Sequence, residues 1–268
     1  MDVQPKKLAV LIDADNSSVS SIALILEEVA KYGIASVKRV YGDWSNETLK
    51  NWRDILLPNA ITPVQQFAYT VGKDATDMGM IIDAMDLLYS GALDGFCIIS
   101  SDSDFTPLAS RIRESGLVVY GFGRKKTPEA FRKACDKFIY VENLTEEEKS
   151  LIDIKLLDVT TEEKIEDKEP SKKTQNESAS KKTPEKEQPP TVDRATLNLI
   201  YKAVKDNSDE SGWANLSTVG QYISMVKPDF DARNYGRAKL SGLIKMLELF
   251  DTKIEGSQMY LKKQKKMS

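Results

Sequence analysis

Short apolar runs that alternate with helical patterns constrain the fold of the first 145 residues. Runs rich in β-branched residues lie at residues 8–13, 36–42, 61–69, 95–101, 117–123 and 138–141. Between them, apolar residues recur at helical spacing, at about residues 19–32, 46–56, 75–90, 105–115 and 128–135. Strands that are apolar along their whole length and are separated by helices are typical of a parallel sheet covered on both faces. We therefore predict a doubly wound α/β domain over residues 1–145.

The rest of the chain differs from this domain in composition. Residues 160–190 contain one isoleucine, no other large apolar residue and no aromatic residue. Such a stretch cannot bury enough surface to offset the loss of chain entropy, so we predict a charged flexible linker over residues 146–190. Residues 191–268 carry 13 basic and 9 acidic side chains. Three helical patterns and a hairpin turning at Glu255 and Gly256 predict a smaller C-terminal winged-helix domain there.

The chain of 268 residues contains no histidine. This excludes a Ser-His-Asp triad, a Cys-His nucleophile pair and a zinc site with histidine ligands. Cys97 and Cys135 lie 38 positions apart, too far for a C-x-x-C redox motif. We interpret both as reduced thiols in the core of a cytoplasmic protein. No apolar run approaches the roughly 20 residues of a membrane span, so we expect no membrane association.

Acidic residues follow two of the predicted strands. Asp13 ends the first strand, with Asn16 close behind it, and Asp102 and Asp104 follow the fourth strand and Ser100. In doubly wound sheets, ligands bind beyond the carboxyl ends of the strands, where strand order reverses. Carboxylates that converge there repel one another unless they are protonated or bridged by a cation. Each acid alone is also a common turn or helix-capping residue, and Asp104 could cap the helix that begins at Phe105.

The helix predicted at residues 75–90 supplies a further acid. Asp77 lies four residues before Ile81 on the apolar stripe of this helix, so we expect it to face the mouth of the sheet. Asp83 and Asp86 lie on other faces, and we expect them to be solvated. Acids from three segments at one end of the sheet predict a shared metal site, and oxygen ligands suit Mg²⁺ or Mn²⁺.

Basic residues accompany the acids. Lys73, Arg124 and Lys125 lie in predicted loops or at helix starts near the same mouth, where they could hold the phosphates that flank a cleaved bond. The alternative to phosphate binding, for each of these residues, is that it is an ordinary solvated charge on the surface. Gly121 and Gly123 lack the third glycine of a dinucleotide-binding motif, so we expect no nucleotide cofactor.

These motifs resemble the NYN domain of the PIN-like ribonuclease superfamily, in its LabA-like bacterial branch. The resemblance covers about residues 7–144 and is carried, in order, by LAVLIDADN, VGKDATDMGMIIDAMDLL, CIISSDSDFTPLASRIRESG and VVYGFGRKKTPEAFRKACDKFIYV. It implies hydrolysis of RNA phosphodiesters. It also implies a set of metal-binding acids with supporting polar residues: Asp13, Asp77, Asp102 and Asp104, supported by Asn16 and Ser100. One departure is Ser101, where many members have glycine.

The C-terminal motifs GWANLSTVGQYI and FDARNYGRAKLSGL resemble the OST-HTH (LOTUS) domain. This resemblance implies RNA binding or protein docking. We expect one continuous third helix, beginning after Asp231 and running over residues 232–248. Arg233 and Arg237 should share an exposed face of this helix and bind RNA there. The sequence leaves open whether this domain binds a protein partner and whether the protein forms a homo-oligomer.

Together these features predict an endoribonuclease that depends on Mg²⁺ or Mn²⁺ and captures RNA through its C-terminal module. Water would be the nucleophile, activated by one or two metal ions. Two alternatives stay open. One is a non-catalytic RNA-binding or scaffolding protein whose acids hold no metal. The other is a haloacid-dehalogenase-type phosphatase, suggested by Asp13 and Asp15 after the first strand.

Overall fold

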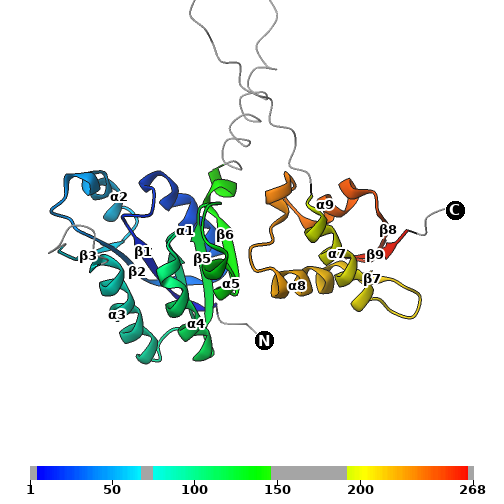
Figure 1. Ribbon diagram of the computed structural model, residues 1–268, viewed down its shortest axis with the longest axis horizontal. Coiled ribbons are helices and arrows are strands. Elements are labelled where there is room, and N and C mark those ends of the chain that lie inside the picture. Colours follow the sequence, from blue (N-terminus) through cyan, green and yellow to red (C-terminus); the bar gives the residue numbers. More distant parts are fainter. Residues whose placement is uncertain (1–4, 68–74, 146–191, 265–268) are drawn as a thin grey trace, which may run out of the picture.

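The computed structural model describes residues 5–67, 75–145 and 192–264, which form a larger and a smaller domain lying side by side (Figure 1). The six strands of the larger domain are β1 (Lys7–Asp13), β2 (Ile34–Gly42), β3 (Thr62–Gln65), β4 (Gly95–Ile99), β5 (Val118–Gly123) and β6 (Lys137–Tyr140). All neighbouring strands pair in parallel, in the order β3-β2-β1-β4-β5-β6. The predicted doubly wound α/β fold is confirmed.

The central strands are the most apolar ones. Six of the seven residues of β1 are buried, and so are all five residues of β4. Strands of this composition leave neither face to water, so they take the middle of the sheet. Because β1 and β4 are neighbours, their carboxyl ends open at the same place, where the strand order reverses.

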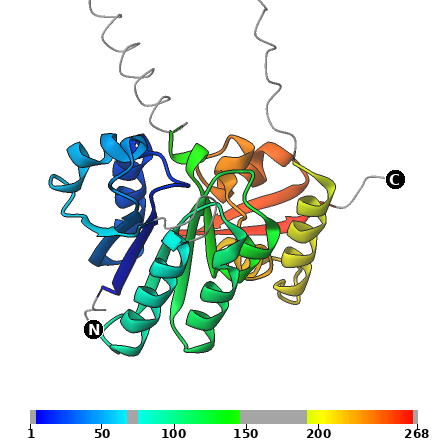
Figure 2. The same cartoon turned by 60° about the vertical axis from the view of Figure 1, so that its left-hand side comes forward.

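Helices cover both faces of this sheet. On one face, α3 (Ala75–Tyr89), α4 (Thr106–Glu114) and α5 (Glu129–Ala134) bury Met80, Leu108 and Phe131 in one core. Figure 2 shows α3 and α4 side by side on this face. On the other face, α1 (Ile22–Ala30) and α2 (Arg53–Leu56), with the 3-10 turn before α2, form a second core that includes Ile25 and Trp52.

The two glycines of β5 have a packing role. A Cβ atom at Gly121 would lie 2.6 Å from Cys135 Sγ, and one at Gly123 would lie 2.6 Å from the carbonyl oxygen of Ser100. Both distances are far too short for contacts between real atoms, so only glycine at these positions lets the neighbouring segments of the protein approach this closely. β5 therefore lies directly against the segment that follows β4.

The smaller domain packs three helices against a short antiparallel sheet. Its elements are α7 (Arg194–Asp206), α8 (Leu216–Val226), α9 (Leu240–Leu247), β7 (Ala214–Asn215), β8 (Phe250–Glu255) and β9 (Gln258–Lys263), with the strand order β7-β9-β8. Ile200, Val219, Leu243 and Leu261 are buried at its centre. The hairpin turns at Gly256, whose φ of +62° favours glycine. The expected smaller C-terminal domain is confirmed.

The prediction of one continuous third helix after Asp231 is wrong. The segment instead forms a 3-10 turn over Ala232–Tyr235, and α9 begins only at Leu240. The Asp231 side chain accepts a hydrogen bond from the Arg233 amide and starts the turn, while Gly236, in the left-handed region at φ 68°, ends it. Residues of the turn therefore do not share a face with α9.

The two domains contact each other directly. The amide of Phe138, on β6, donates to the carbonyl oxygen of Pro228 across the boundary at 3.0 Å. The predicted linker over residues 146–190 lies wholly outside the described residues. Among the residues described, no helix is long and apolar enough to cross a lipid bilayer.

Candidate active site

Asp13 is the last residue of β1, and its side chain is completely buried. One carboxylate oxygen, Oδ1, accepts hydrogen bonds from the amides of Asp15 (3.1 Å) and Asn16 (3.2 Å). The other, Oδ2, accepts from Asn16 Nδ2 at 2.9 Å and from Ser100 Oγ at 2.7 Å. The turn after β1 therefore folds around the carboxylate and fixes its direction.

The pKa of Asp13 is raised above its ordinary value, chiefly because burial disfavours the charged form. Hydrogen bonds from Ser100 and Asn16 act in the opposite direction without cancelling this effect. The described donors to this carboxylate are amide and hydroxyl groups, and none of them carries a positive charge. A cation at this position would compensate the cost of burying the carboxylate.

Ser100 joins the ends of β1 and β4. It follows Ile99, which pairs with Ile12 in the sheet, and its hydroxyl donates to Asp13 while accepting the amide hydrogen of Asp102 at 3.1 Å. Asp102 in turn accepts the Asp104 amide at 3.0 Å. A continuous chain of hydrogen bonds thus runs from the buried Asp13 carboxylate to the exposed Asp104.

Asp102 also has a local structural role. Its side chain caps the 3-10 turn over Ser103–Phe105 that leads into α4. The cap that sequence reasoning offered as an alternative for Asp104 belongs to Asp102 instead. Asp102 remains partly exposed and Asp104 is exposed, so both carboxylates can be reached from the mouth of the sheet.

Asp77 lies half-buried in the first turn of α3. Three and seven residues further along, Met80 and Ala84 are buried in the core, so this turn stands over the sheet, as its apolar stripe predicts. Lys73 lies outside the described residues. Within residues 5–67, 75–145 and 192–264, no three acidic or cysteine side chains are already grouped to hold one metal ion.

The helix faces assigned to the two further acids of α3 need one correction. Asp86 is exposed, as expected. Asp83 is not simply solvated, because it forms an ion pair with Arg39 and accepts a hydrogen bond from the hydroxyl of Tyr41, both on β2. The position of β2 beside α3 is a long-range feature that local spacing does not reveal.

The loop after β5 brings basic residues to the same edge of the sheet. The amide of Arg124 donates to Ser101 Oγ at 3.0 Å, next to Asp102. The side chains of Arg124 and Lys125 are exposed. Ser101, which sequence reasoning noted only as a departure from glycine, therefore holds this loop against the segment after β4.

The expectation that Arg233 lies on an exposed helix face is wrong. Its side chain is 11% exposed and contacts two carboxylates, Asp231 at 2.6 Å and Glu28 of α1 at 3.3 Å. Arg233 therefore faces the larger domain rather than solvent. Arg237 is exposed, with its Nε atom 3.3 Å from Met246 Sδ.

Comparison with known proteins divides the chain in the same way. A family model described as the NYN domain matches residues 7–144, and one described as the OST-HTH/LOTUS domain matches residues 187–260. No curated protein matches the sequence.

Two solved structures are among those similar to this chain. A protein of unknown function from Vibrio parahaemolyticus is 19% identical, with a TM-score of 0.41, over 52% of this chain and 94% of that one. An uncharacterized protein from Nitrosomonas europaea is 33% identical, with a TM-score of 0.27, over 35% of this chain and 96% of that one.

Proposed function

This chain belongs to the NYN domain family, and on that premise we propose that it is a divalent-metal-dependent endoribonuclease. The NYN domain indicates a nuclease-type hydrolase, and the OST-HTH/LOTUS domain that follows it indicates an RNA-binding module. The proposal adds metal dependence, endonucleolytic cleavage and RNA as the substrate. The observation that carries it is the buried Asp13 carboxylate, bonded through Ser100 to the acids that follow β4.

The position of this group supports the proposal. Asp13 ends β1 and Ser100 follows the adjacent strand β4, on the two sides of the strand-order reversal, where ligands of doubly wound sheets bind. Exposed Asp104 and partly exposed Asp102 give the mouth a negative charge. A phosphodiester is also negative, so its approach requires compensating positive charge. Arg124 and Lys125 supply part of that charge from the loop after β5.

The donor atoms of these residues fit a hard divalent ion. Carboxylate, hydroxyl and amide oxygens are the ligands that Mg²⁺ and Mn²⁺ prefer. We propose Asp13, Asp77, Asp102 and Asp104 as the acids that hold the ion. When bound, the ion would neutralise phosphate charge and lower the pKa of a water molecule. Asn16 and Ser100 would hold the Asp13 carboxylate in one orientation through their hydrogen bonds.

The phosphatase alternative differs from this proposal in its nucleophile. A phosphatase of the haloacid-dehalogenase type would carry phosphate on the Asp13 carboxylate during its reaction, whereas the proposed nuclease uses water and forms no phosphorylated aspartate. A search for covalent phosphate on Asp13, by mass spectrometry after incubation with a phosphate ester, should therefore find none.

The decisive experiment incubates the full chain with end-labelled RNA and with DNA of the same sequence, with Mn²⁺, with Mg²⁺ or with EDTA. We expect internal cleavage of RNA that EDTA abolishes. Asp104→Asn should remove this cleavage without unfolding the protein, because the side chain is exposed. Asp86→Asn, an exposed acid on the solvent side of α3, is the matched control and should cleave normally.

Metal binding is measured separately, from the loss of the free Mn²⁺ signal in electron paramagnetic resonance. Binding that is weakened in Asp104→Asn supports the metal site whether or not a cleaved RNA is found. Absence of both Mn²⁺ binding and cleavage would refute the proposal and leave the non-catalytic RNA-binding protein as the better description.

A further inference from the structure

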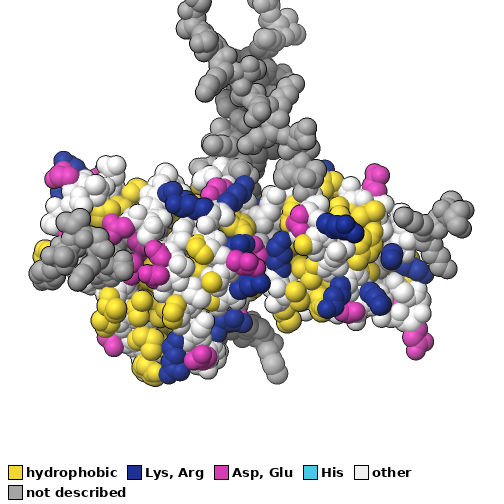
Figure 3. Space-filling model, viewed as in Figure 1, with side chains coloured by type: hydrophobic (Ala, Val, Ile, Leu, Met, Phe, Trp, Pro, Cys, Tyr) yellow, Lys and Arg dark blue, Asp and Glu magenta, His cyan; other side chains and the backbone are white. Residues whose placement is uncertain are grey.

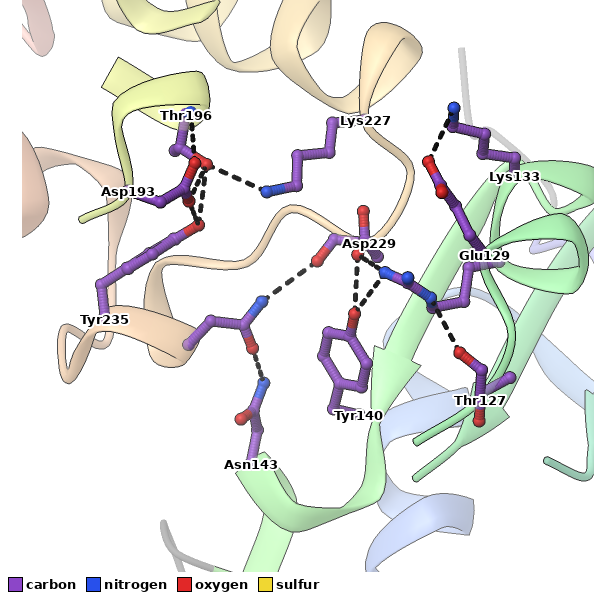
Figure 4. Close-up of polar contacts among 12 residues, drawn as sticks. Thr127, Glu129, Lys133, Tyr140, Asn143, Asp193, Thr196, Lys227, Asp229 and Tyr235 are labelled. Carbon is purple, nitrogen blue, oxygen red and sulfur yellow. Dashed lines mark hydrogen bonds and ion pairs between the residues drawn. The ribbon is translucent and has the colours of Figure 1, made fainter. Parts of the chain in front are cut away.

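Polar contacts from two sides hold the domains together. Asp229, in the smaller domain, accepts hydrogen bonds from Arg132 of α5 and from the hydroxyl of Tyr140 at the end of β6 (Figure 4). The Asn143 side chain donates to Asn234 Oδ1 at 2.5 Å. On the other side, Arg233 forms its ion pair with Glu28. These contacts fix the orientation of the smaller domain, so the space between the domains has a defined shape.

That space contains a cavity of about 810 Å³, here called the interdomain groove. Its walls include Lys125 and Lys133 from the larger domain and Lys227 from the smaller one. Leu199 and Val226 add an apolar part. Ligand pockets in proteins commonly measure about 300–1,000 Å³, so this cavity is large enough for part of a bound molecule.

The charge of the interdomain groove is positive. Its basic side chains are Lys125, Arg132, Lys133 and Lys227, and its acidic ones are Glu129 and Asp229. Both acids are already engaged, Glu129 by Lys133 at 2.8 Å and Asp229 by Arg132. Lys227 Nζ donates to Thr196 Oγ1 at 2.9 Å and interacts electrostatically with the Asp193 carboxylate, which accepts a hydrogen bond from the same hydroxyl. Figure 3 shows Lys and Arg side chains gathered where the two domains meet.

One loop connects the interdomain groove with the candidate active site. Arg124 bonds to Ser101 beside Asp102, and the next residue, Lys125, lines the groove. Consecutive Cα atoms lie about 3.8 Å apart, so the mouth of the sheet and the groove meet at neighbouring residues of one loop. The amide of Lys125 donates to the Glu142 carboxylate at 3.1 Å, which ties this loop to the segment after β6.

From this geometry we infer that the interdomain groove binds the RNA strand next to the cleaved phosphodiester. Lys125 and Lys227 would contact its phosphates, and Leu199 and Val226 would pack against its bases or riboses. A positive groove with an apolar wall suits an unpaired strand, whereas a duplex would be too wide to enter a cavity of this size. This inference rests on the proposed function for the identity of its occupant, and it specifies a substrate that is single-stranded beside the cleavage site.

The test measures RNA affinity by fluorescence anisotropy in EDTA, so that no cleavage occurs. The full chain is titrated into a labelled single-stranded RNA of 12 nucleotides and into a blunt RNA duplex of the same sequence. We expect tighter binding of the single strand. Lys125→Ala combined with Lys227→Ala should weaken it about tenfold and lower the salt slope by about 1.4, since about 0.7 counterions are released per phosphate contact on a single strand.

Two control variants separate charge from folding. Lys245→Ala removes an exposed lysine of α9 outside the groove and should bind as the wild type does. Lys227→Arg keeps the charge and should restore most of the affinity lost in Lys227→Ala. Small-angle X-ray scattering of each variant should give an unchanged radius of gyration.

The outcomes separate this inference from the proposed function. If the double variant keeps the RNA affinity and the salt slope of the wild type, the interdomain groove does not bind RNA. This conclusion holds even if the protein cleaves RNA with Mn²⁺. Equal affinity for the duplex would overturn the single-strand requirement. A weakened double variant of a protein that never cleaves RNA would support the groove and count only against catalysis.

Discussion

The ion pair between Glu28 and Arg233 should couple the stabilities of the two domains. Glu28 is 4% exposed and belongs to α1, while Arg233 is 11% exposed and belongs to the smaller domain. Within its own domain Glu28 also binds Lys31 Nζ at 2.6 Å and the Tyr32 hydroxyl at 2.6 Å. The perturbation is a double-mutant cycle of Glu28→Gln, Arg233→Ala and the combined variant.

The expected coupling follows from the contacts of the Glu28 carboxylate. Its pKa is lowered from 4.5 to about 2 by bonds from Lys31, Tyr32 and Arg233, against the effect of burial. A shift of this size corresponds to about 3 kcal/mol in full, and Arg233 is one of three partners. Removing a partner from a buried pair costs about 3–5 kcal/mol when nothing else compensates. Because Lys31 and Tyr32 remain, and because solvent screens the cluster, we expect a coupling of about 1–2 kcal/mol.

Hydrogen exchange read by mass spectrometry is the appropriate assay, because it reports separately on peptides from each domain. A coupling of about 1–2 kcal/mol changes protection factors by about 5- to 30-fold, and we expect this change in peptides of residues 192–264. The matched control is the pair of Lys253 and Glu255 on β8, which are 36% and 60% exposed. Its cycle should give less than about 0.5 kcal/mol.

The pH dependence gives the same prediction an independent check. A carboxylate whose pKa is lower in the folded protein stabilises the fold fully above its unfolded value of 4.5 and loses this contribution as the pH falls toward about 2. The difference in stability between the wild type and Glu28→Gln should therefore shrink from pH 5 to pH 3. A coupling energy of zero at neutral pH would refute the reasoning, because the two side chains would then not interact in solution.

Three further predictions concern the larger domain. Asp102→Asn should lower RNA cleavage by about 100-fold or more. Its melting temperature should stay nearly unchanged, because asparagine also caps helical turns. Cleavage at the wild-type rate in this variant would show that Asp102 is not part of the site. Ser100→Ala should destabilise the domain by about 1–3 kcal/mol in urea unfolding, because the buried Asp13 loses a donor at 2.7 Å; an unchanged midpoint would contradict this. Asp83→Asn should lower the free energy of unfolding by about 1 kcal/mol, since its partner Arg39 is 33% exposed. The rate of RNA cleavage should stay within about twofold of the wild type. A large loss of activity would instead place Asp83 in the site.

Local sequence patterns predicted the parts of this protein that local physics determines. The strands follow from uninterrupted apolar runs, and the meeting of Asp13 with Ser100 follows from their positions at the ends of two parallel strands. Capping was an alternative for Asp104, but Asp102 is the residue that caps the turn, because both acids lie within the same turn and sequence does not distinguish them.

Contacts between distant segments were beyond such reasoning. Asp83 meets Arg39 only because β2 lies beside α3, and Arg233 is buried only because the smaller domain docks on α1. The apolar stripe after Asp231 favoured one helix, but the left-handed Gly236 divides the segment into a turn and a shorter helix. Each error therefore arose where a tertiary contact or a single backbone conformation overrides a periodic pattern.

The bond from the Phe138 amide to the Pro228 carbonyl has a consequence for solubility. β6 is an edge strand of the parallel sheet, and the outward-facing amides of an edge strand are a template for pairing with another chain. Pro228 accepts the Phe138 hydrogen bond but has no amide hydrogen of its own, so it covers this edge without extending the sheet. The smaller domain thus covers part of the edge of β6. A fragment that ends near residue 145 would expose the edge of β6 and should self-associate as its concentration rises.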